Sequence, residues 1–317
     1  MLKNLHGMNA RAILVAMSRL PAVCIVVLNW NGLSDTRECL QSLQKTRYGN
    51  FHVVVVDNGS EADEASVIER EFRGFAQVIR NQRNLGFAAG ANFGIHHGLS
   101  TGADHILLLN NDVVTDPGFL SELVTAAEER IDVAAVCPKA FFYGERNVIY
   151  STGGTVNVWT ATARQVGRGQ QDRGQFDRIE ERGYADGLCM LMPAAAIGRI
   201  GLLDEDYFAY WEETDWCYRA REAGLRCYYV PGARVWHKAA RSRRRDNTYR
   251  YLYRRNAFLF VRKRGKLVHF VTALLVHLLV YAPRYFLTHP ADLGRVPAEA
   301  RALFAKAGRR ARQGPLL

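Results

Sequence analysis

The chain has 317 residues, of which 48% are hydrophobic and 23% charged. This composition excludes intrinsic disorder, a collagen-like chain, a small disulfide-stapled fold and a multi-span membrane protein. The net charge of +11 is unevenly placed, because residues 226–317 carry 21 Lys and Arg against three acids. A basic tail of this kind predicts a polyanionic partner, which is nucleic acid, anionic lipid or a phosphorylated substrate.

The six cysteines and the N-terminus indicate a reducing compartment. Neither Cys-x-x-Cys nor His-Glu-x-x-His occurs, so we expect buried free thiols rather than disulfides or a zinc site. The apolar run 12–17 is shorter than the roughly 7–15 residues of a signal-peptide core. We therefore expect residues 1–19 to form a leader that directs no export, and the protein to be cytoplasmic.

Apolar runs alternate with amphipathic segments through the first half of the chain. The segment between 116 and about 130, with Pro117 at its first turn, is typical of a helix. The predicted strands are Val23–Leu28, Val53–Val56, Gln77–Arg80, His105–Leu109 and Val133–Cys137. This alternation predicts an α/β fold with a mostly parallel sheet flanked by helices.

Polar residues follow three of these strands, at 29–31, 57–60 and 110–112. Each group alone is most often a turn. Because ligands of parallel sheets bind beyond the carboxyl ends of the strands, the three groups together favour a binding site. Beyond them, we expect hairpins and loops over 140–182 and a helix over 194–200.

Two acidic groups are candidates for chemistry. Asp112 follows a strand directly and offers the oxygen ligand that divalent hard cations prefer. In the run 211–215, which reads Trp-Glu-Glu-Thr-Asp, crowded carboxyls would have raised pKa values, as a general base needs. An ordinary acidic first helical turn is the open alternative. His237 is a candidate metal ligand, although a lone histidine is more often structural.

In this order, the motifs resemble those of inverting family 2 glycosyltransferases with the GT-A fold, a Rossmann-like arrangement. The resemblance covers residues 20–240 and is strongest to the bacterial rhamnosyltransferase and galactofuranosyltransferase group. It rests on Asn29-Trp-Asn-Gly32, Asp57-Asn-Gly-Ser60, the run 84–92, Asn110-Asn-Asp112, Trp211-Glu-Glu-Thr-Asp215 and Val-Trp-His237.

The resemblance implies a role for each matching residue. Glu213 would be the catalytic base, and Asp112 and His237 would hold Mg²⁺ or Mn²⁺. The acceptor side would be lined by Asp186, Trp211, Glu212 and Asp215. The nucleotide-sugar donor would be bound by Asn31, Asp57, Asn84, Gly86, Gly90 and Asn110.

Two residues depart from the family pattern. Asn110 replaces the first Asp of the family's Asp-x-Asp motif, so metal ligation would rest on Asp112, His237 and the donor diphosphate. Glu213 stands where many relatives have Asp, which adds one methylene of reach. The implied reaction is inverting transfer of a sugar, with rhamnose one possibility, to a hydroxyl of a cell-surface glycan or a lipid-linked acceptor.

The resemblance divides the chain into a nucleotide-sugar half at 20–137, an acceptor half at 138–240 and a basic helical extension at 241–317. Residues 267–282 are apolar but short of the about 20 residues that a spanning helix needs. On a helical projection Lys266, His277 and Arg284 fall on nearly one side with His269 flanking, which predicts an interfacial helix on an anionic membrane surface. A buried helix of a C-terminal bundle is the alternative.

Three other functions compete with this one. A nucleic-acid-binding tail lacks a recognisable module, so we expect no nucleic-acid partner. A nicotinamide-dependent dehydrogenase would need Gly-x-Gly-x-x-Gly after a strand, and none occurs. A nucleotidyltransferase would share the fold and metal but would release diphosphate. We expect the protein at the cytoplasmic face of a membrane; the sequence does not indicate an oligomeric state.

Overall fold

The computed structural model describes residues 19–239 and 247–283. They belong to two compact units, one of residues up to 157 with 162–260, the other of 158–161 with residues from 261 onward. The predicted leader apart from Arg19, the predicted domain boundary at 240 and the basic residues 284–317 lie outside the described residues.

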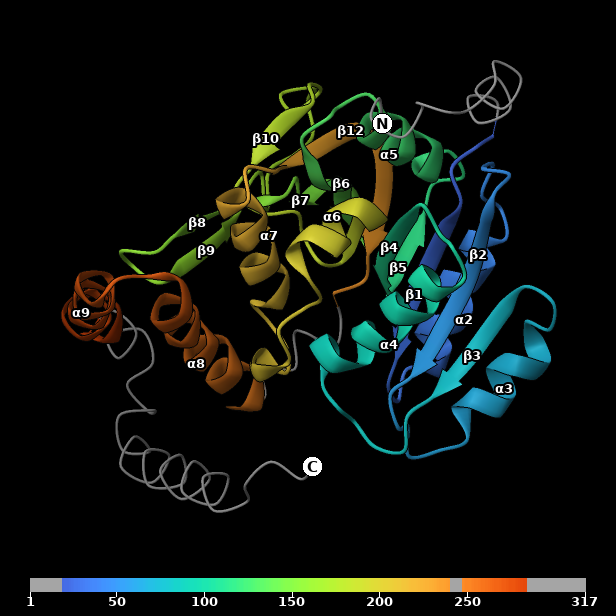
Figure 1. Ribbon diagram of the computed structural model, residues 1–317, viewed down its shortest axis with the longest axis horizontal. Coiled ribbons are helices and arrows are strands. Elements are labelled where there is room, and N and C mark those ends of the chain that lie inside the picture. Colours follow the sequence, from blue (N-terminus) through green and yellow to red (C-terminus); the bar gives the residue numbers. More distant parts are fainter. Residues whose placement is uncertain (1–18, 240–246, 284–317) are drawn as a thin grey trace, which may run out of the picture. The chain divides into compact units, whose positions relative to one another are not determined.

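The first unit is built on a ten-stranded sheet (Figure 1). Four parallel strands from the first half of the chain lie side by side in the order β3 (Ala76–Arg80), β2 (Phe51–Asp57), β1 (Val23–Asn29) and β4 (His105–Asn110). The antiparallel β11 (Cys189–Pro193) joins β4 to β6 (Val133–Phe142), and β12 (Arg226–His237) runs parallel to β6. The prediction of a mostly parallel sheet is confirmed.

Shorter strands extend this sheet and cover one edge. They are β5 (Val113–Thr115) and β10 (Glu180–Arg182), both on β12, and β7 (Glu145–Ser151), which forms a hairpin with β6. A separate two-stranded ribbon is formed by β8 (Gly154–Asn157) and β9 (Thr162–Gln165). The hairpins predicted for 140–182 are therefore present.

Both faces of the sheet are covered by helices. Val23, Ile25 and Val27 of β1 pack with α2 (Leu33–Leu43), α3 (Glu64–Glu71) and α5 (Phe119–Glu128), whereas Cys24 and Val26 pack with the opposite set. That set is α4 (Phe87–Ser100), α6 (Ala194–Ile200) and α7 (Glu212–Glu222). Burial on both faces explains why β1 is a continuous apolar run. All six cysteines are buried and free, as predicted.

Helix α8 (Asn247–Arg264) starts in the first unit, and its last four residues belong to the second. In the second unit it is followed by α9 (Leu267–Val276) and a π-helical turn, η3 (His277–Tyr281). The His269 ring lies 4.3 Å from that of Trp159, and His277 Nε2 lies 3.0 Å from the Thr160 carbonyl oxygen. Among the described residues, no helix has the length and hydropathy needed to cross a bilayer.

Candidate active site

The carboxyl ends of the parallel strands bring the predicted polar groups to one edge of the sheet. Asn29 at the end of β1 is opposite Asp57 at the end of β2, and Leu28 is opposite Asn110 at the end of β4. β11 is antiparallel to both β4 and β6, and β12 is parallel to β6, so β12 ends at this same edge with His237. The topology thus gathers groups that are up to about 200 residues apart in sequence.

A buried hydrogen-bond network holds the ends of β1 and β2 together. The Asn29 amide donates to Asp57 Oδ1 at 2.7 Å and to Glu64 Oε2 at 2.9 Å, and its own oxygen accepts from Thr36. Ser60 Oγ donates to Asp57 Oδ1 at 2.6 Å and accepts from the Asn31 backbone at 3.0 Å. Asn31 and Asp57, both predicted site residues, are therefore joined through Ser60.

The roles of Glu64 and Asn29 were not predicted from the sequence. Glu64 looks like one of several acids in a polar helix, yet its carboxylate accepts from both the Asn29 side chain and the Gly32 backbone. Asn29 could have indicated this network, because a buried side-chain amide at the end of an apolar strand needs hydrogen-bond partners from elsewhere in the chain.

Asn84 and Gly86 lie in the turn after β3, and Gly90 lies in the first turn of α4. The buried Asn58 amide donates to Asn84 Oδ1 at 3.1 Å and to the Gly86 carbonyl at 2.9 Å. Gly86 has φ +87°, and a Cβ there would lie 2.4 Å from the Phe208 carbonyl oxygen. A Cβ on Gly90 would lie 2.7 Å from a Leu28 methyl group. Packing within the protein is thus sufficient to require both glycines, and their contact with a nucleotide stays a prediction.

Asp112 and His237 meet between β4 and β12. Asp112 Oδ1 lies 3.1 Å from His237 Nε2, and His237 Nδ1 is buried with no hydrogen-bond partner among the described residues. Burial raises the pKa of Asp112, but the hydrogen bond and charge of His237, aided by Lys238, outweigh it and hold that pKa below its usual value. The carboxylate is therefore ionised at neutral pH, as a metal ligand must be.

The pair fits a divalent cation that also takes ligands from a bound substrate. A carboxylate oxygen and an imidazole nitrogen are both ordinary ligands for Mn²⁺. Within residues 19–239 and 247–283, no group of three or more His, Cys, Asp or Glu side chains is placed to hold a metal. Asn110, which stands beside this pair, is half-buried and donates its backbone N–H to the Leu188 carbonyl.

Glu213 lies in the first turn of α7 and packs over Gly187, where a Cβ would be 3.2 Å from Glu213 Cγ. Gly187 is next to Leu188, whose carbonyl accepts from Asn110, so Glu213 lies near the end of β4. Burial raises the pKa of Glu213 to about 7, with a further contribution from the charge of Asp186. A carboxyl group with this pKa can accept a proton at neutral pH. Asp186 itself accepts from Gln165 Nε2 at 2.6 Å.

The neighbours of Glu213 differ in their surroundings. Burial, and then the charge of Glu213, raises the pKa of Glu212 well above its usual value, and Glu212 Oε2 has no described hydrogen-bond partner. Trp211 Nε1 is also buried without one, and its ring packs against Tyr253 and Phe260. Unpartnered buried polar atoms beside a candidate base are groups that a ligand could satisfy.

Asp215 has internal partners for both of its carboxylate oxygens. It is fully buried, accepts from the Tyr207 hydroxyl at 2.9 Å and from Arg219 Nε at 2.9 Å. These two bonds tie the first turn of α7 to Tyr207 and to Arg219, and the place on the acceptor side that the resemblance implied for Asp215 stays a prediction.

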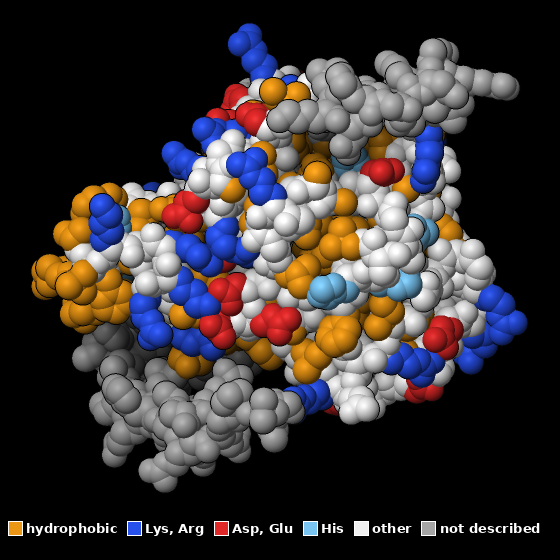
Figure 2. Space-filling view, in the orientation of Figure 1, with side chains coloured by type: hydrophobic (Ala, Val, Ile, Leu, Met, Phe, Trp, Pro, Cys, Tyr) orange, Lys and Arg blue, Asp and Glu red, His pale blue; other side chains and the backbone are white. Residues whose placement is uncertain are grey.

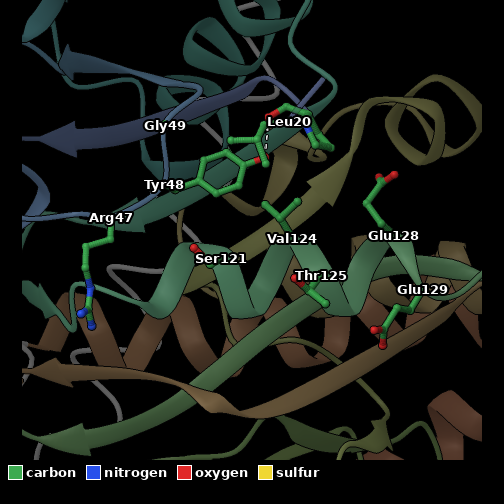
Figure 3. A pocket seen from close by; sticks show the side chains of 10 residues that line it. Leu20, Arg47, Tyr48, Gly49, Ser121, Val124, Thr125, Glu128 and Glu129 are labelled. Atoms are coloured by element: carbon green, nitrogen blue, oxygen red, sulfur yellow. Dashed lines mark hydrogen bonds between the residues drawn. The ribbon is translucent and has the colours of Figure 1, made fainter. Parts of the chain in front are cut away.

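The pocket in Figure 3 is separate from these residues. It has a volume of about 440 Å³ and lies beside Leu20 and Tyr48, at the end of the sheet where β1 begins. No predicted site residue lines it.

Comparison with known proteins agrees with the fold and with the predicted family. The model of a family described as glycosyltransferase like family 2 matches residues 21–257. The N-acetylglucosaminyl-diphospho-decaprenol L-rhamnosyltransferase of Mycobacterium tuberculosis is 26% identical over 250 residues, which are 70% of this chain and 78% of that protein. Protein y4gI of Sinorhizobium fredii is 28% identical over 251 residues, and the match spans 73% of this chain but only 26% of that protein.

A solved structure shows the same fold. The mannosyltransferase PcManGT of Pyrobaculum calidifontis, solved with GDP-Man and Mn²⁺, superposes with a TM-score of 0.58 over 93% of this chain and 81% of its own, at 17% identity. Since the family model covers most of the chain and the sheet has the GT-A arrangement, the protein belongs to the family 2 glycosyltransferases.

Proposed function

We propose that this glycosyltransferase moves a sugar from a nucleotide-diphosphate donor to a hydroxyl of a lipid-linked or glycan acceptor, with inversion at the anomeric carbon. The observation that carries the proposal is Glu213, a half-buried carboxyl group whose pKa is raised to about 7, at the edge where β1, β2 and β4 end. Rhamnose is the first sugar to test, because a relative is named for rhamnosyl transfer to a sugar on a decaprenol diphosphate.

In the proposed mechanism, Glu213 accepts the proton of the acceptor hydroxyl while that oxygen attacks the anomeric carbon. The bond between this carbon and the diphosphate oxygen breaks, and its electron pair stays with the leaving nucleoside diphosphate. Attack from the face opposite the leaving group inverts the configuration. The leaving diphosphate needs no proton in this step, so one titrating carboxylate is sufficient.

Donor and metal are assigned to the carboxyl edge of the sheet. Asp112 and His237 would hold Mg²⁺ or Mn²⁺, which when bound would neutralise charge on the diphosphate. The nucleotide and diphosphate would lie over the strand ends, the turns and the start of α4 that together carry Asn31, Asp57, Asn84, Gly86, Gly90 and Asn110. Support comes from the closeness of these turns and from the solved relative that holds GDP-Man and Mn²⁺.

The acceptor is assigned to the side of Glu213. Asp186, Trp211 and Glu212 would contact it, since Trp211 Nε1 and Glu212 Oε2 are buried polar atoms with no described partner. Asp215, whose oxygens are already bound by Tyr207 and Arg219, would support α7 from behind.

We further propose a peripheral location on the cytoplasmic face of an anionic membrane. His269 and His277 contact Trp159 and Thr160, so the polar side that the helical projection predicted packs on residues 158–161 of the same unit. Large apolar side chains of α9 and η3 are each 40–79% exposed, and they form an orange group over α9 in Figure 2. They are Leu267, Val268, Val271, Leu274, Leu275, Leu278, Leu279 and Val280. Arg262, Lys263, Arg264 and Lys266 directly precede this group. An apolar face beside clustered cations suits an anionic bilayer surface.

A thermal-unfolding screen of nucleotide-sugars tests donor and metal together. A ligand at about 100 times its Kd stabilises the folded state by about 2.7 kcal/mol, so the true donor should raise the Tm measurably, and more so with Mn²⁺ or Mg²⁺. Asp112→Asn should lose the metal-dependent part of this rise and keep the remainder. Asp132→Asn is the matched control, because Asp132 accepts from Tyr228 away from the site. A full metal-dependent rise in Asp112→Asn would show that the cation binds elsewhere.

A further inference from the structure

The segment just before Glu213 has an unfavourable backbone. Phe208, Tyr210 and Trp211 have φ values of +65°, +71° and +76°, a region that side chains other than glycine rarely adopt. Trp211 is the N-cap of α7, and its carbonyl accepts from the Asp215 N–H at 2.8 Å. The direction in which α7 begins, and with it the position of Glu213, depends on this segment keeping its conformation.

One side chain from a distant helix holds the segment. Asn256 of α8 is fully buried, and its amide nitrogen lies 2.8 Å from the Tyr207 and Ala209 carbonyl oxygens and 2.7 Å from that of Tyr210. Arg255 adds bonds of 2.8 Å to the carbonyls of Asp206 and Tyr207 and donates to Asn256 Oδ1. Three carbonyls of one short loop therefore converge on a single amide, which ties the loop to α8.

The same segment also touches the donor side. The Phe208 carbonyl accepts from the Ala88 N–H at 3.2 Å, and Phe208 packs on Gly86. Four residues before this loop, the Leu203 backbone is also fixed to α4, because the Asn92 side chain donates to the Leu203 carbonyl at 2.9 Å and accepts from the Leu203 N–H at 3.1 Å. The loop held by Asn256 therefore lies between the turn assigned to the nucleotide and the helix that carries Glu213.

We propose that Asn256 is a positioning residue for the transfer reaction, which fixes the loop 207–211 and so aims the Glu213 carboxylate at the acceptor hydroxyl. The proposal rests on the proposed function of Glu213 as the base. It assigns Asn256 no contact with substrate: its polar atoms are taken by the loop and by Arg255. A displacement of about 1 Å at a reacting group can cost about 10²-fold in rate.

The test uses the full chain with Asn256→Ala, which removes the donors, and Asn256→Asp, which keeps the shape but sets carboxylate oxygens against three carbonyls. Asn50→Asp is the matched control, because the half-buried Asn50 amide donates to a carbonyl far from the loop, that of Leu20. We expect both Asn256 variants to lose about 10–100-fold in kcat, with donor KM changed less than about threefold and nucleoside diphosphate affinity retained. The acidic limb of the pH–rate profile should shift in both variants and stay in place in Asn50→Asp.

Hydrogen–deuterium exchange supplies a readout that does not depend on activity. In Asn256→Ala, amides in 207–215 should exchange faster while those of β1, β2 and β4 keep their protection. Unchanged exchange in 207–215, or faster exchange with kcat and pH profile unchanged, would overturn the proposal. If the wild-type chain transferred no sugar at all, the proposed function would fail, and the exchange experiment would still decide whether Asn256 fixes the loop.

Discussion

Glu213 is the residue on which the proposed chemistry depends. Its side chain is half-buried at the start of α7, where desolvation and the charge of Asp186 raise its pKa to about 7. If its ionised form is the base, kcat should rise with pH up to about 7 and then level off. The neutral isostere Gln cannot take the proton.

Glu213→Gln should therefore lower kcat by about 10²–10⁴-fold, remove the acidic limb of the pH–rate profile and leave nucleoside diphosphate affinity close to that of the wild type. The pKa of Glu213 is higher in the folded state than in the unfolded state. The free energy of unfolding of the wild type therefore falls as the pH rises from the ordinary glutamate pKa to about 7. Glu213→Gln has no such group, so this variant should be at least as stable as the wild type above pH 7. Transfer at the wild-type rate by Glu213→Gln, with loss in Glu212→Gln, would move the base to Glu212.

At this scale the sequence predicted the charged centres but not their supports. Asp57, Asp112 and Glu213 follow strands or open a helix, where periodicity reveals them. Asn256 was not predicted, because its partners lie 46 to 49 residues earlier in the chain. A hint was present: Leu252, Asn256 and Phe260 are buried at i, i+4 and i+8 on α8, and an amide in such a stripe needs internal partners.

Among the elements, α9 carries a surface that packing within its unit leaves exposed. Ala273 is fully buried, and the two histidines contact residues 159 and 160, so the leucine-rich side is outermost. If this side enters a bilayer, a charge placed on it should oppose binding through the cost of burying that charge.

The double variant Leu274→Glu with Leu278→Glu should bind vesicles rich in phosphatidylglycerol at least about tenfold less than the wild type does, measured by sedimentation of the full chain with the vesicles. The wild-type chain itself should bind less to neutral vesicles, and less to anionic vesicles at high salt. Ile131→Glu is the control, because Ile131 is a fully exposed apolar residue in the first unit. Unchanged vesicle binding by the double variant would remove α9 from the proposed membrane contact. Loss of a concentration-dependent dimer instead would assign the face to a second copy of the chain.

The strands show how far apolar runs predict element bounds. β1 and β4 each extend one residue beyond their predicted ends, to Asn29 and Asn110, because the pairing with the neighbouring strand continues through these two asparagines. β6 continues five residues past its predicted end at Cys137, through Pro138 and Lys139, which look like a strand terminus. Lys139 is nevertheless fully buried, because it pairs with Asp172 at 3.0 Å and Asp177 at 2.6 Å. The hydrophobic pattern around Lys139 does not predict these ion pairs, because both partners lie more than 30 residues away in the sequence.

For the whole molecule, the order of the motifs along the chain was enough to predict the fold and the family. The sheet topology brings these motifs, which are far apart in the sequence, to one edge of the sheet. Groups from β1, β2, β4 and β12 share an edge only because β12 returns parallel to β6. The proposed outcome of this arrangement is a single displacement at the anomeric carbon, with Glu213 on the acceptor side and the diphosphate opposite.

The anomeric configuration of the product tests this account most directly. The wild-type chain would be incubated with Mn²⁺, a donor that raises its Tm, and an N-acetylglucosaminyl-diphospho-polyprenol acceptor, and the new linkage would be assigned by NMR. We predict one sugar added per acceptor hydroxyl, with the configuration opposite to that of the donor, and no such product from Glu213→Gln. A product that retains the donor configuration, or equal product from the Glu213→Gln variant, would contradict the proposed mechanism.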